Sequence, residues 1–317
     1  MSYFIGLDIG GTKTAICLAN YDNQKADFLA RLEVKTTKNP KATLEPLFNE
    51  AKKWMKQHEV LCVGVSCGGP LDSKKGIIIC PPSLPGWEDF DICSYVKQSL
   101  GLDAYLQNDA NACAVAEHMF GAGKKVHNMV FLTFGTGLGA GLIIDDRLYE
   151  GTNGNAGEIG HVRLANKGPV GYNKEGSVEG FASGGGISRL AKIKALKLKE
   201  LPECVRKMGG VDNITTKQLA EFAHQGDKFA RSVFRQAGKM FGRALSILID
   251  IINPELIVVG GVYMRSKDLL IRSMKNELRK EALAPSLAVC KIVPATLGEQ
   301  IGDYGALAVA IMNYENR

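Results

Sequence analysis

The segment Leu106–Ala112 carries a carboxylate at the junction of an expected strand and an expected helix. Asp109 follows the weakly apolar run Leu102–Leu106 and opens an Ala-rich helical pattern that continues to about Gly121. Strand ends in α/β proteins line the ligand crevice, so an acid there could act in catalysis, but a carboxylate at a helix start can also serve as an N-cap. This segment alone favours neither role, and the rest of the chain must decide between them.

A glycine-rich turn near the N-terminus has the features of a phosphate site. Gly10-Gly11-Thr12-Lys13 lies between the apolar runs Tyr3–Leu7 and Ala15–Ala19, which predicts a β-hairpin. Adjacent glycines let the backbone approach a ligand, Thr12 adds a hydroxyl donor, and Asp8 could hold a metal ion or its water shell. For the glycine pair alone, a tight hairpin without a ligand is an equally good interpretation.

The same pattern returns twice. Gly135-Thr136-Gly137 interrupts an apolar stretch over residues 130–144, which indicates a weak internal duplication, and two such hairpins could hold a polyphosphate from two sides. The glycines of 135–141 form neither a P-loop nor a Rossmann fingerprint, because no Gly-Lys-Ser/Thr follows and no helix begins there. Gly260-Gly261 follows the apolar strand Leu256–Val259 and suits packing against a flat ring such as adenine.

Several polar residues could bind hydroxyl groups, although each has a simpler interpretation. Glu158 and His161 lie in Gly157-Glu158-Ile159-Gly160-His161, and Glu179 follows later. Taken singly, His161 is explained better as a structural histidine than as a functional one, and Glu179 is explained better as a solvated acid at a helix start. The loop Cys67–Asp72 again exposes backbone donors after the strand Val60–Ser66.

Length and patterning predict the organisation of the chain. With 317 residues, 45% of them hydrophobic, the chain can form two domains or two lobes that share a cleft. Strands alternate with helices in mixed order, and helices dominate after residue 186. The strongest patterns are an amphipathic helix over 41–58, a short strand over 76–80, a basic helix over 187–200, helices over 216–223 and 228–252, and a C-terminal helix from Gly302.

Composition narrows the class of protein. No apolar run could span a bilayer, and the N-terminus lacks the basic region of a signal peptide, so we expect a cytoplasmic protein without a membrane partner. The eight cysteines include no CxxC pair and are expected to be reduced. The net charge of +6 is modest, and its lysines are spread along helices, which argues against a nucleic-acid partner.

Taken together, the motifs resemble those of the ROK-family sugar kinases in order and spacing, over nearly the whole chain. The matching segments are Leu7–Lys13, Asn108–Asn111, Phe134–Gly139, Gly157–His161 and Val259–Val262. The family also includes transcriptional repressors that carry a winged-helix domain ahead of the first motif. Asp8 lies close to the start of this sequence, which favours a kinase.

The resemblance implies an α/β fold of the actin-like ATPase (ribonuclease H-like) class, with two lobes of mixed sheets around an interlobe cleft. We expect an N-terminal lobe over 1–120 and a larger C-terminal lobe over 121–317, whose last helix is a candidate to pack back on the first lobe. It further implies ATP and Mg²⁺ as cofactors, a small-molecule sugar as substrate, and a homodimer or homotetramer.

The resemblance also assigns roles to single residues. Asp109 matches the catalytic base, which takes a proton from the sugar hydroxyl that attacks the γ-phosphate. The sugar-binding matches are Gly69, Asn108, Glu158, His161 and Glu179, together with Ser83 from the loop Pro81–Trp87. The nucleotide-binding matches are Asp8, Gly10, Gly11, Thr12, Lys13, Thr136, Gly137, Gly260 and Gly261.

Two departures from the family pattern affect these expectations. The family usually has three zinc-binding cysteines between His161 and Glu179, but those positions hold Val170, Tyr172 and Ser177, so we predict no structural zinc and a loop held by packing, with Val170 and Tyr172 as candidates. Ser83 replaces the usual asparagine, and its hydroxyl cannot make the same two-ended contact, so the preferred sugar is open.

Three functions follow from these observations. The first is phosphorylation of a hexose or derivative, such as glucose, fructose, allose, N-acetylmannosamine or a β-glucoside. The second is a non-catalytic sugar sensor of the same fold, which the lost cysteines and Ser83 would suit and which has no need of Asp109. An actin-like scaffold ATPase is disfavoured by the set Glu158, His161 and Glu179.

Overall fold

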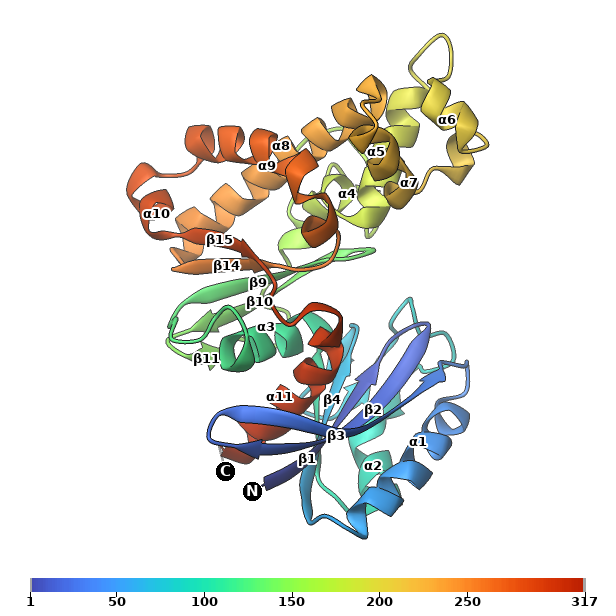
Figure 1. Cartoon of the computed structure of the whole chain (residues 1–317), viewed down its shortest axis with the longest axis vertical. Helices are drawn as coiled ribbons and strands as arrows, with labels where there is room; N and C mark the ends of the chain where they lie inside the picture. Colours follow the sequence, from blue (N-terminus) through green and yellow to red (C-terminus); the bar gives the residue numbers. More distant parts are fainter. Residues whose placement is uncertain (1, 316–317) are drawn as a thin grey trace. The chain divides into compact units, whose positions relative to one another are not determined.

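The computed structural model describes residues 2–315, which form an α/β protein of two compact units (Figure 1). Unit 1 comprises residues 2–126, 141–156 and 296–315, and unit 2 comprises residues 127–140 and 157–295. Residues 141–156 and 296–315 therefore group with the N-terminal part of the chain. This division differs from the expected one, in which the N-terminal lobe covers residues 1–120 and the C-terminal lobe covers the rest.

Unit 1 is built on a five-stranded mixed sheet with the order β3-β2-β1-β4-β8. The strands are β1 (Ser2–Ile9), β2 (Lys13–Asp22), β3 (Lys25–Lys35), β4 (Val60–Cys67) and β8 (Ala104–Asn108). β1 to β3 pair antiparallel, which confirms the expected first hairpin, and β1, β4 and β8 are parallel. A small sheet contains β5 (Leu71–Asp72), β6 (Ile77–Ile78) and β7 (Phe90–Asp91), so the strand expected over 76–80 is shorter than predicted.

The two faces of this sheet are covered by different helices, as Figure 1 shows. The helices of unit 1 are α1 (Pro40–Met55), α2 (Ile92–Leu100), α3 (Asp109–Phe120) and α11 (Ile301–Glu315), with η3 (Gly298–Gln300) before the last. Ile5 and Leu7 share a buried cluster with residues of α1 and α2, whereas Phe4 packs with Leu307 and Ala310 of α11. Because side chains alternate along a strand, Gly6 and Asp8 lie on the same side as Phe4, facing α11.

The C-terminal helix packs directly on the sheet backbone. A Cβ atom at Gly64 would lie only 2.0 Å from the carbonyl oxygen of Ala306, and one at Gly6 would lie 3.0 Å from the amide nitrogen of Leu307. Glycine on the strands and small residues on the helix make this approach possible. The N-terminus of α11 is thereby brought to Asp8, since a Cβ atom at Gly302 would lie 2.3 Å from Asp8 Oδ2.

A buried carboxylate fixes the far end of α3. Glu117 is fully buried, and its two oxygens accept hydrogen bonds from the Ala122 amide (2.8 Å), the Thr296 amide (2.8 Å) and hydroxyl (2.9 Å), and the Leu297 amide (3.0 Å). A buried charge is tolerated only when it is paired or fully hydrogen-bonded. Glu117 therefore anchors the helix that begins at Asp109 to the segment that precedes α11, a role that the sequence analysis did not anticipate.

Unit 2 combines parallel strands with most of the helices of the chain. The second sheet has the order β11-β10-β9-β14-β15, and the chain passes between the units within β10 (Leu138–Ile144) and continues to β11 (Arg147–Leu148). β14 (Leu256–Val259) pairs in parallel with β9 (Met129–Phe134) and β15 (Lys291–Pro294). The other elements are η1 (Ile159–His161), β12 (Val170–Gly171), β13 (Lys174–Glu175), α4 (Val178–Phe181), α5 (Gly184–Ala195), α6 (Glu203–Lys207), η2 (Val211–Asn213), α7 (Thr216–His224), α8 (Lys228–Ile252), α9 (Val262–Glu281) and α10 (Ala284–Val289).

The structure matches the prediction for α8 and departs from the prediction for α5. α8 spans the predicted residues because Asp227 caps its first turn through the Ala230 amide and Asn253 ends it in the left-handed conformation. α5 differs from the prediction over 187–200: it begins at Gly184, where Ser183 provides the N-cap, and ends at Ala195. Across residues 2–315, none of the helices combines the length and apolar character that crossing a membrane requires.

Candidate functional site

The junction between β8 and α3 presents Asp109 at the surface of unit 1. Asn108 caps the helix, because its Oδ1 accepts a hydrogen bond from the Ala110 amide at 2.9 Å. Asp109 occupies the first turn, is exposed, and accepts from the same amide at 2.8 Å. Asn108 is therefore the N-cap of the helix, and the carboxylate of Asp109 lies exposed beside it.

Further predicted sugar-binding residues lie around this junction. A Cβ atom at Gly68 would be 3.9 Å from both Asp109 Oδ2 and Ser83 Oγ, and one at Gly69 would be 3.4 Å from Asn108 Nδ2. The loop after β4, the Ser83 loop and the start of α3 therefore converge on one place within unit 1. We call Gly69, Ser83, Asn108 and Asp109 the acceptor set, because a carboxylate, an amide, a hydroxyl and backbone groups can bind a polyhydroxylated ligand.

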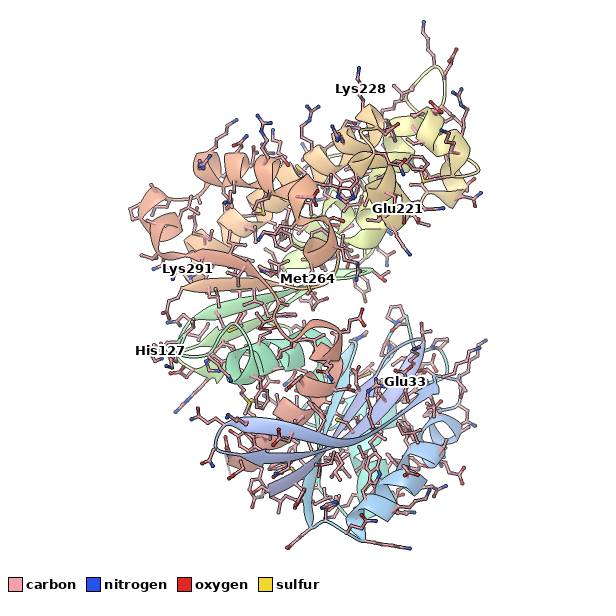
Figure 2. All side chains as sticks on the ribbon, viewed as in Figure 1. Glu33, His127, Glu221, Lys228, Met264 and Lys291 are labelled. Atoms are coloured by element: carbon pink, nitrogen blue, oxygen red, sulfur yellow. The ribbon has the colours of Figure 1, made fainter. Side chains whose placement is uncertain are left out.

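The first glycine turn adjoins the acceptor set. The Gly10 amide donates to the Lys13 carbonyl at 3.0 Å, and the Thr36 hydroxyl donates to the Gly10 carbonyl at 2.6 Å. A Cβ atom at Gly11 would lie 2.6 Å from the Ser83 carbonyl oxygen, so glycine is required for this contact. The side chain of Lys13 forms an ion pair with Glu33 of β3, which Figure 2 labels.

Asp8 lies behind this turn in an environment that disfavours its ionised form. Its carboxylate accepts a hydrogen bond from Ser66 and faces Asp303 and Asp109. The pKa of Asp8 is raised to about 6, mainly by burial and further by the charges of Asp303 and Asp109, while the Ser66 hydrogen bond and the Arg31 charge oppose the shift. Asp303 itself is held by Arg31, whose Nε donates to Asp303 Oδ2 at 2.7 Å.

These acids fit a Mg²⁺ ion that is bound mainly through water and phosphate. Within the described part of the chain, no three His, Cys, Asp or Glu side chains come together as a direct metal site. Mg²⁺ commonly keeps several waters and uses one or two protein carboxylates together with substrate phosphates. The ionised form of Asp8 is unfavourable in the protein alone, and a nearby cation would stabilise it. Asp8 therefore has the chemistry to contact a hydrated Mg²⁺ ion through water.

In unit 2, the second and third glycine turns lie together. A Cβ atom at Gly261 would lie 2.1 Å from the Phe134 carbonyl oxygen, at the end of β9 where Gly135-Thr136-Gly137 begins. The Gly184 and Gly185 amides donate to the carbonyls of Gly135 (2.8 Å) and Thr136 (3.1 Å). The predicted nucleotide-binding residues of this unit thus share one edge of its sheet, with Thr136 exposed.

Glu179 contacts the second turn. Its Oε2 accepts a hydrogen bond from the Leu138 amide at 3.1 Å, and a Cβ atom at Gly137 would lie 2.6 Å from the same oxygen. Glu179, which is predicted to bind sugar, therefore also holds the turn that is predicted to bind phosphate. Nothing in the spacing of Glu179 from that turn indicated this contact.

Glu158 directly precedes η1, and His161 is its last residue. Desolvation raises the pKa of Glu158, the nearby charge of His161 lowers it, and the charge of Glu179 raises it. The three side chains that were grouped by resemblance are thus close enough within unit 2 to act on one another electrostatically.

The loop between His161 and Glu179 is not held by the residues predicted to pack it. Val170 and Tyr172 are 48% and 61% exposed, so that prediction is wrong. The loop is fixed instead by the hairpin of β12 and β13 and by Ser177, whose hydroxyl accepts from the Gly180 amide and donates to the Gly171 carbonyl. Tyr172 meets the ring of His161 edge-on, with centroids 6.2 Å apart.

We expect purified protein to contain no stoichiometric zinc, because this loop is closed by backbone pairing and Ser177 occupies one of the cysteine positions. Metal analysis by mass spectrometry after gel filtration measures this directly. One zinc per chain would contradict the interpretation of the loop.

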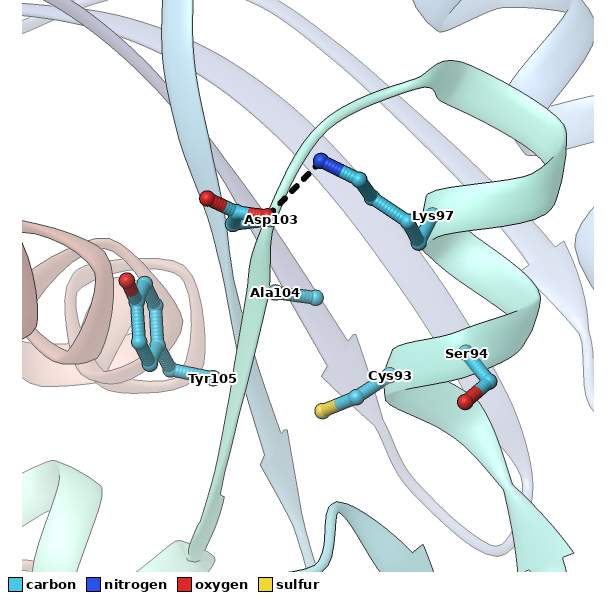
Figure 3. Close-up of a pocket in the computed structure, with 6 residues that line it drawn as sticks. All are labelled: Cys93, Ser94, Lys97, Asp103, Ala104 and Tyr105. Carbon is cyan, nitrogen blue, oxygen red and sulfur yellow. Dashed lines mark hydrogen bonds and ion pairs between the residues drawn. The ribbon is translucent and has the colours of Figure 1, made fainter.

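One shallow depression lies away from these residues. It has a volume of about 340 Å³ between α2 and β8, and the ion pair of Lys97 with Asp103 lies at its edge (Figure 3). Its lining includes none of the residues predicted to bind sugar or nucleotide, and we assign it no role.

Comparison with known proteins identifies the family. The model of the ROK family matches residues 4–313. The chain belongs to the ROK family. It is 30% identical over 314 residues to a glucokinase of Streptomyces coelicolor, with 98% of both chains covered. A crystal structure of a ROK family glucokinase from Streptomyces griseus, in complex with glucose and AMPPNP, matches with a TM-score of 0.78 and 30% identity over 98% of this chain and 100% of that one.

The ROK family also contains repressors that resemble this chain. A xylose repressor of Caldicellulosiruptor bescii is 27% identical over 313 residues, which cover 97% of this chain and 77% of the repressor. The expected actin-like α/β class of fold is confirmed by the family and the glucokinase structure, and the sugar-kinase resemblance is confirmed at the level of the family.

Proposed function

We propose that this ROK-family protein is an ATP- and Mg²⁺-dependent kinase of a hexose or hexose derivative. The observation that carries the proposal is the acceptor set, in which an exposed carboxylate at a helix start stands beside an amide, a hydroxyl and a glycine loop. The glucokinase relatives support the same chemistry.

In the proposed reaction, Asp109 takes the proton of the sugar hydroxyl as its oxygen attacks the γ-phosphorus of ATP. The bond from that phosphorus to the bridging oxygen breaks, and ADP leaves. Phosphoryl transfer depends mainly on positioning and on neutralising charge, so the protein needs little more than a well-placed base and donors to the phosphates. Mg²⁺, held near Asp8 through water, would neutralise phosphate charge.

The remaining residues are proposed to bind the two substrates. Asn108, Ser83 and Gly69 would bind sugar hydroxyls, and the same role is proposed for Glu158, His161 and Glu179. A polar group left unpaired by the wrong sugar costs roughly 1–3 kcal/mol, which gives such a set its selectivity. The glycine turns at Gly10-Gly11, Thr136-Gly137 and Gly260-Gly261 would bind ATP.

A sugar sensor is the second candidate, and the repressor relative favours it. A sensor would bind a sugar in the same acceptor set without turning over ATP. Ser83 in place of the family's asparagine is compatible with either function.

The decisive experiment is a sugar panel with Mg-ATP and a coupled assay of ADP release. We expect ADP release that depends on one or more of glucose, fructose, allose, N-acetylmannosamine or a β-glucoside. Calorimetric binding of a sugar without any ADP release would instead support the sensor, and ADP release independent of sugar would contradict both.

A further inference from the structure

A network of hydrogen bonds between polar side chains lies next to the acceptor set, with Gln107 and Asn111 buried and Ser73, Asn108 and Glu150 half-buried. Gln107, the residue before Asn108, is 5% exposed, and its Oε1 accepts hydrogen bonds from the Asn108 amide at 2.8 Å and from Asn111 Nδ2 at 3.0 Å. Its Nε2 donates to Glu150 Oε1 at 2.9 Å, and the Ser73 hydroxyl donates to the same oxygen at 3.0 Å. All five residues belong to unit 1.

The chemistry of the partners fixes the direction of every hydrogen bond in this network. A backbone amide can only donate, so the Gln107 atom that faces Asn108 must be its oxygen, and the other end must be the amide nitrogen. That nitrogen can only donate, which requires an acceptor such as the carboxylate of Glu150. The Gln107–Glu150 pair therefore has one donor and one acceptor, and replacing the donor nitrogen of Gln107 by a second acceptor must break it.

The network joins three segments of unit 1, two of which lead directly into the acceptor set. Gln107 lies at the end of β8, Ser73 follows β5 and the Gly69 loop, and Glu150 begins the loop that leads to Glu158. That loop is closed on itself, since the Ala156 amide donates to the Glu150 carbonyl at 3.0 Å. A shift of Gln107 would thus move the Asn108 amide, which is the cap position of the helix that presents Asp109.

We propose that Gln107 and Glu150 are positioning residues that hold the Asn108–Asp109 junction in the geometry required for sugar recognition and transfer. Neither residue is assigned contact with a substrate. The inference rests on the proposed function, because it assigns the acceptor set to a sugar. It adds two residues that neither the motifs nor the family resemblance singled out.

The test is a swap of donor and acceptor. In Gln107→Glu, one oxygen of the new carboxylate still accepts from Asn108, but the other faces the Glu150 carboxylate. We expect kcat/KM for the sugar to fall by about tenfold or more, through both KM for the sugar and kcat, with KM for ATP unchanged. Glu150→Gln alone can keep its contacts through its carbonyl oxygen and should change kcat/KM by less than about threefold.

The double variant Gln107→Glu/Glu150→Gln restores complementarity, because the new amide can donate to the new carboxylate and the Ser73 hydroxyl can accept. We expect it to recover most of the activity lost in Gln107→Glu. The matched control is Glu45→Gln, a change of the same kind at an exposed position of α1, which should behave like the wild type.

Several results would overturn the inference. Wild-type kinetics in Gln107→Glu would do so, as would a double variant no better than that single variant, or an equal rise of KM for ATP and for the sugar. If Gln107→Glu does not fold, the double variant decides: folding and activity support the pairing, and failure to fold contradicts it. If the wild type phosphorylates no sugar, the proposed function fails, but recovery of the thermal midpoint in the double variant still measures the pairing.

Discussion

Replacing Asp109 by Asn is expected to lower kcat by about 10²- to 10⁴-fold while leaving the Kd of the sugar within a few fold of the wild type. An amide cannot accept the proton of the attacking hydroxyl, but it retains a carbonyl oxygen for hydrogen bonding. The effect should therefore appear in turnover and not in binding, measured as ADP release and as sugar calorimetry.

The structure explains why this variant should remain folded. Asn108 supplies the cap of α3, and the carbonyl oxygen of the new side chain can still accept from the Ala110 amide. We expect a change in the free energy of unfolding within about 0.5 kcal/mol, as for other surface substitutions. Asp27→Asn on β3, exposed and outside the acceptor set, is the matched control. Retained turnover in Asp109→Asn would remove Asp109 from its proposed role.

Local patterns carried most of the fold prediction. The hairpin of β1 and β2 follows from two apolar runs around Gly10-Gly11, and the bounds of α8 follow from Asp227 and Asn253, which are caps that act within one turn of the helix. The start of α5 was placed less well, although Ser183 offers a local cap. α5 begins three residues earlier than predicted because Ser183 caps it and glycines form its first turn.

The candidate site was predicted residue by residue, but not its supporting contacts. Glu117 and Gln107 each act through partners far along the chain, and a sequence gives no local sign of which segment will supply them. Glu117 did carry one indication, a charge on the otherwise apolar face of an Ala-rich helix. Val170 and Tyr172 failed as packing residues because the hairpin closes their loop through backbone pairing, which does not require their side chains to be buried.

The same limit applies to Asp8. Its place after an apolar strand suggested a role near phosphate. Its pKa, however, is raised by burial and by the charge of Asp303, which lies on α11, more than 290 residues later. Strand alternation shows which face Asp8 occupies, and only the packed helix shows what that face meets.

Replacing Asp8 by Asn is expected to make the protein more stable and less active. The pKa of Asp8 is about 6 in the folded protein, against its ordinary value of 3.8. For an acid whose pKa is raised on folding, the native state binds the proton more tightly, so the cost of the ionised form is absent below pH 4 and complete above pH 6. Since one pKa unit corresponds to about 1.4 kcal/mol, that cost is on the order of 1–3 kcal/mol at neutral pH.

Asp8→Asn removes this cost, and Ser66 can still donate to the carbonyl oxygen of the new side chain. In EDTA and without nucleotide, chemical denaturation at pH 7.5 should therefore give a higher free energy of unfolding than the wild type, and the difference should vanish near pH 4. Turnover with Mg-ATP should fall at least about tenfold, because the carboxylate that would help to hold the hydrated ion is lost. A gain in stability that does not depend on pH would contradict the assignment to Asp8, and unchanged turnover would show that its unfavourable ionisation serves no catalytic purpose.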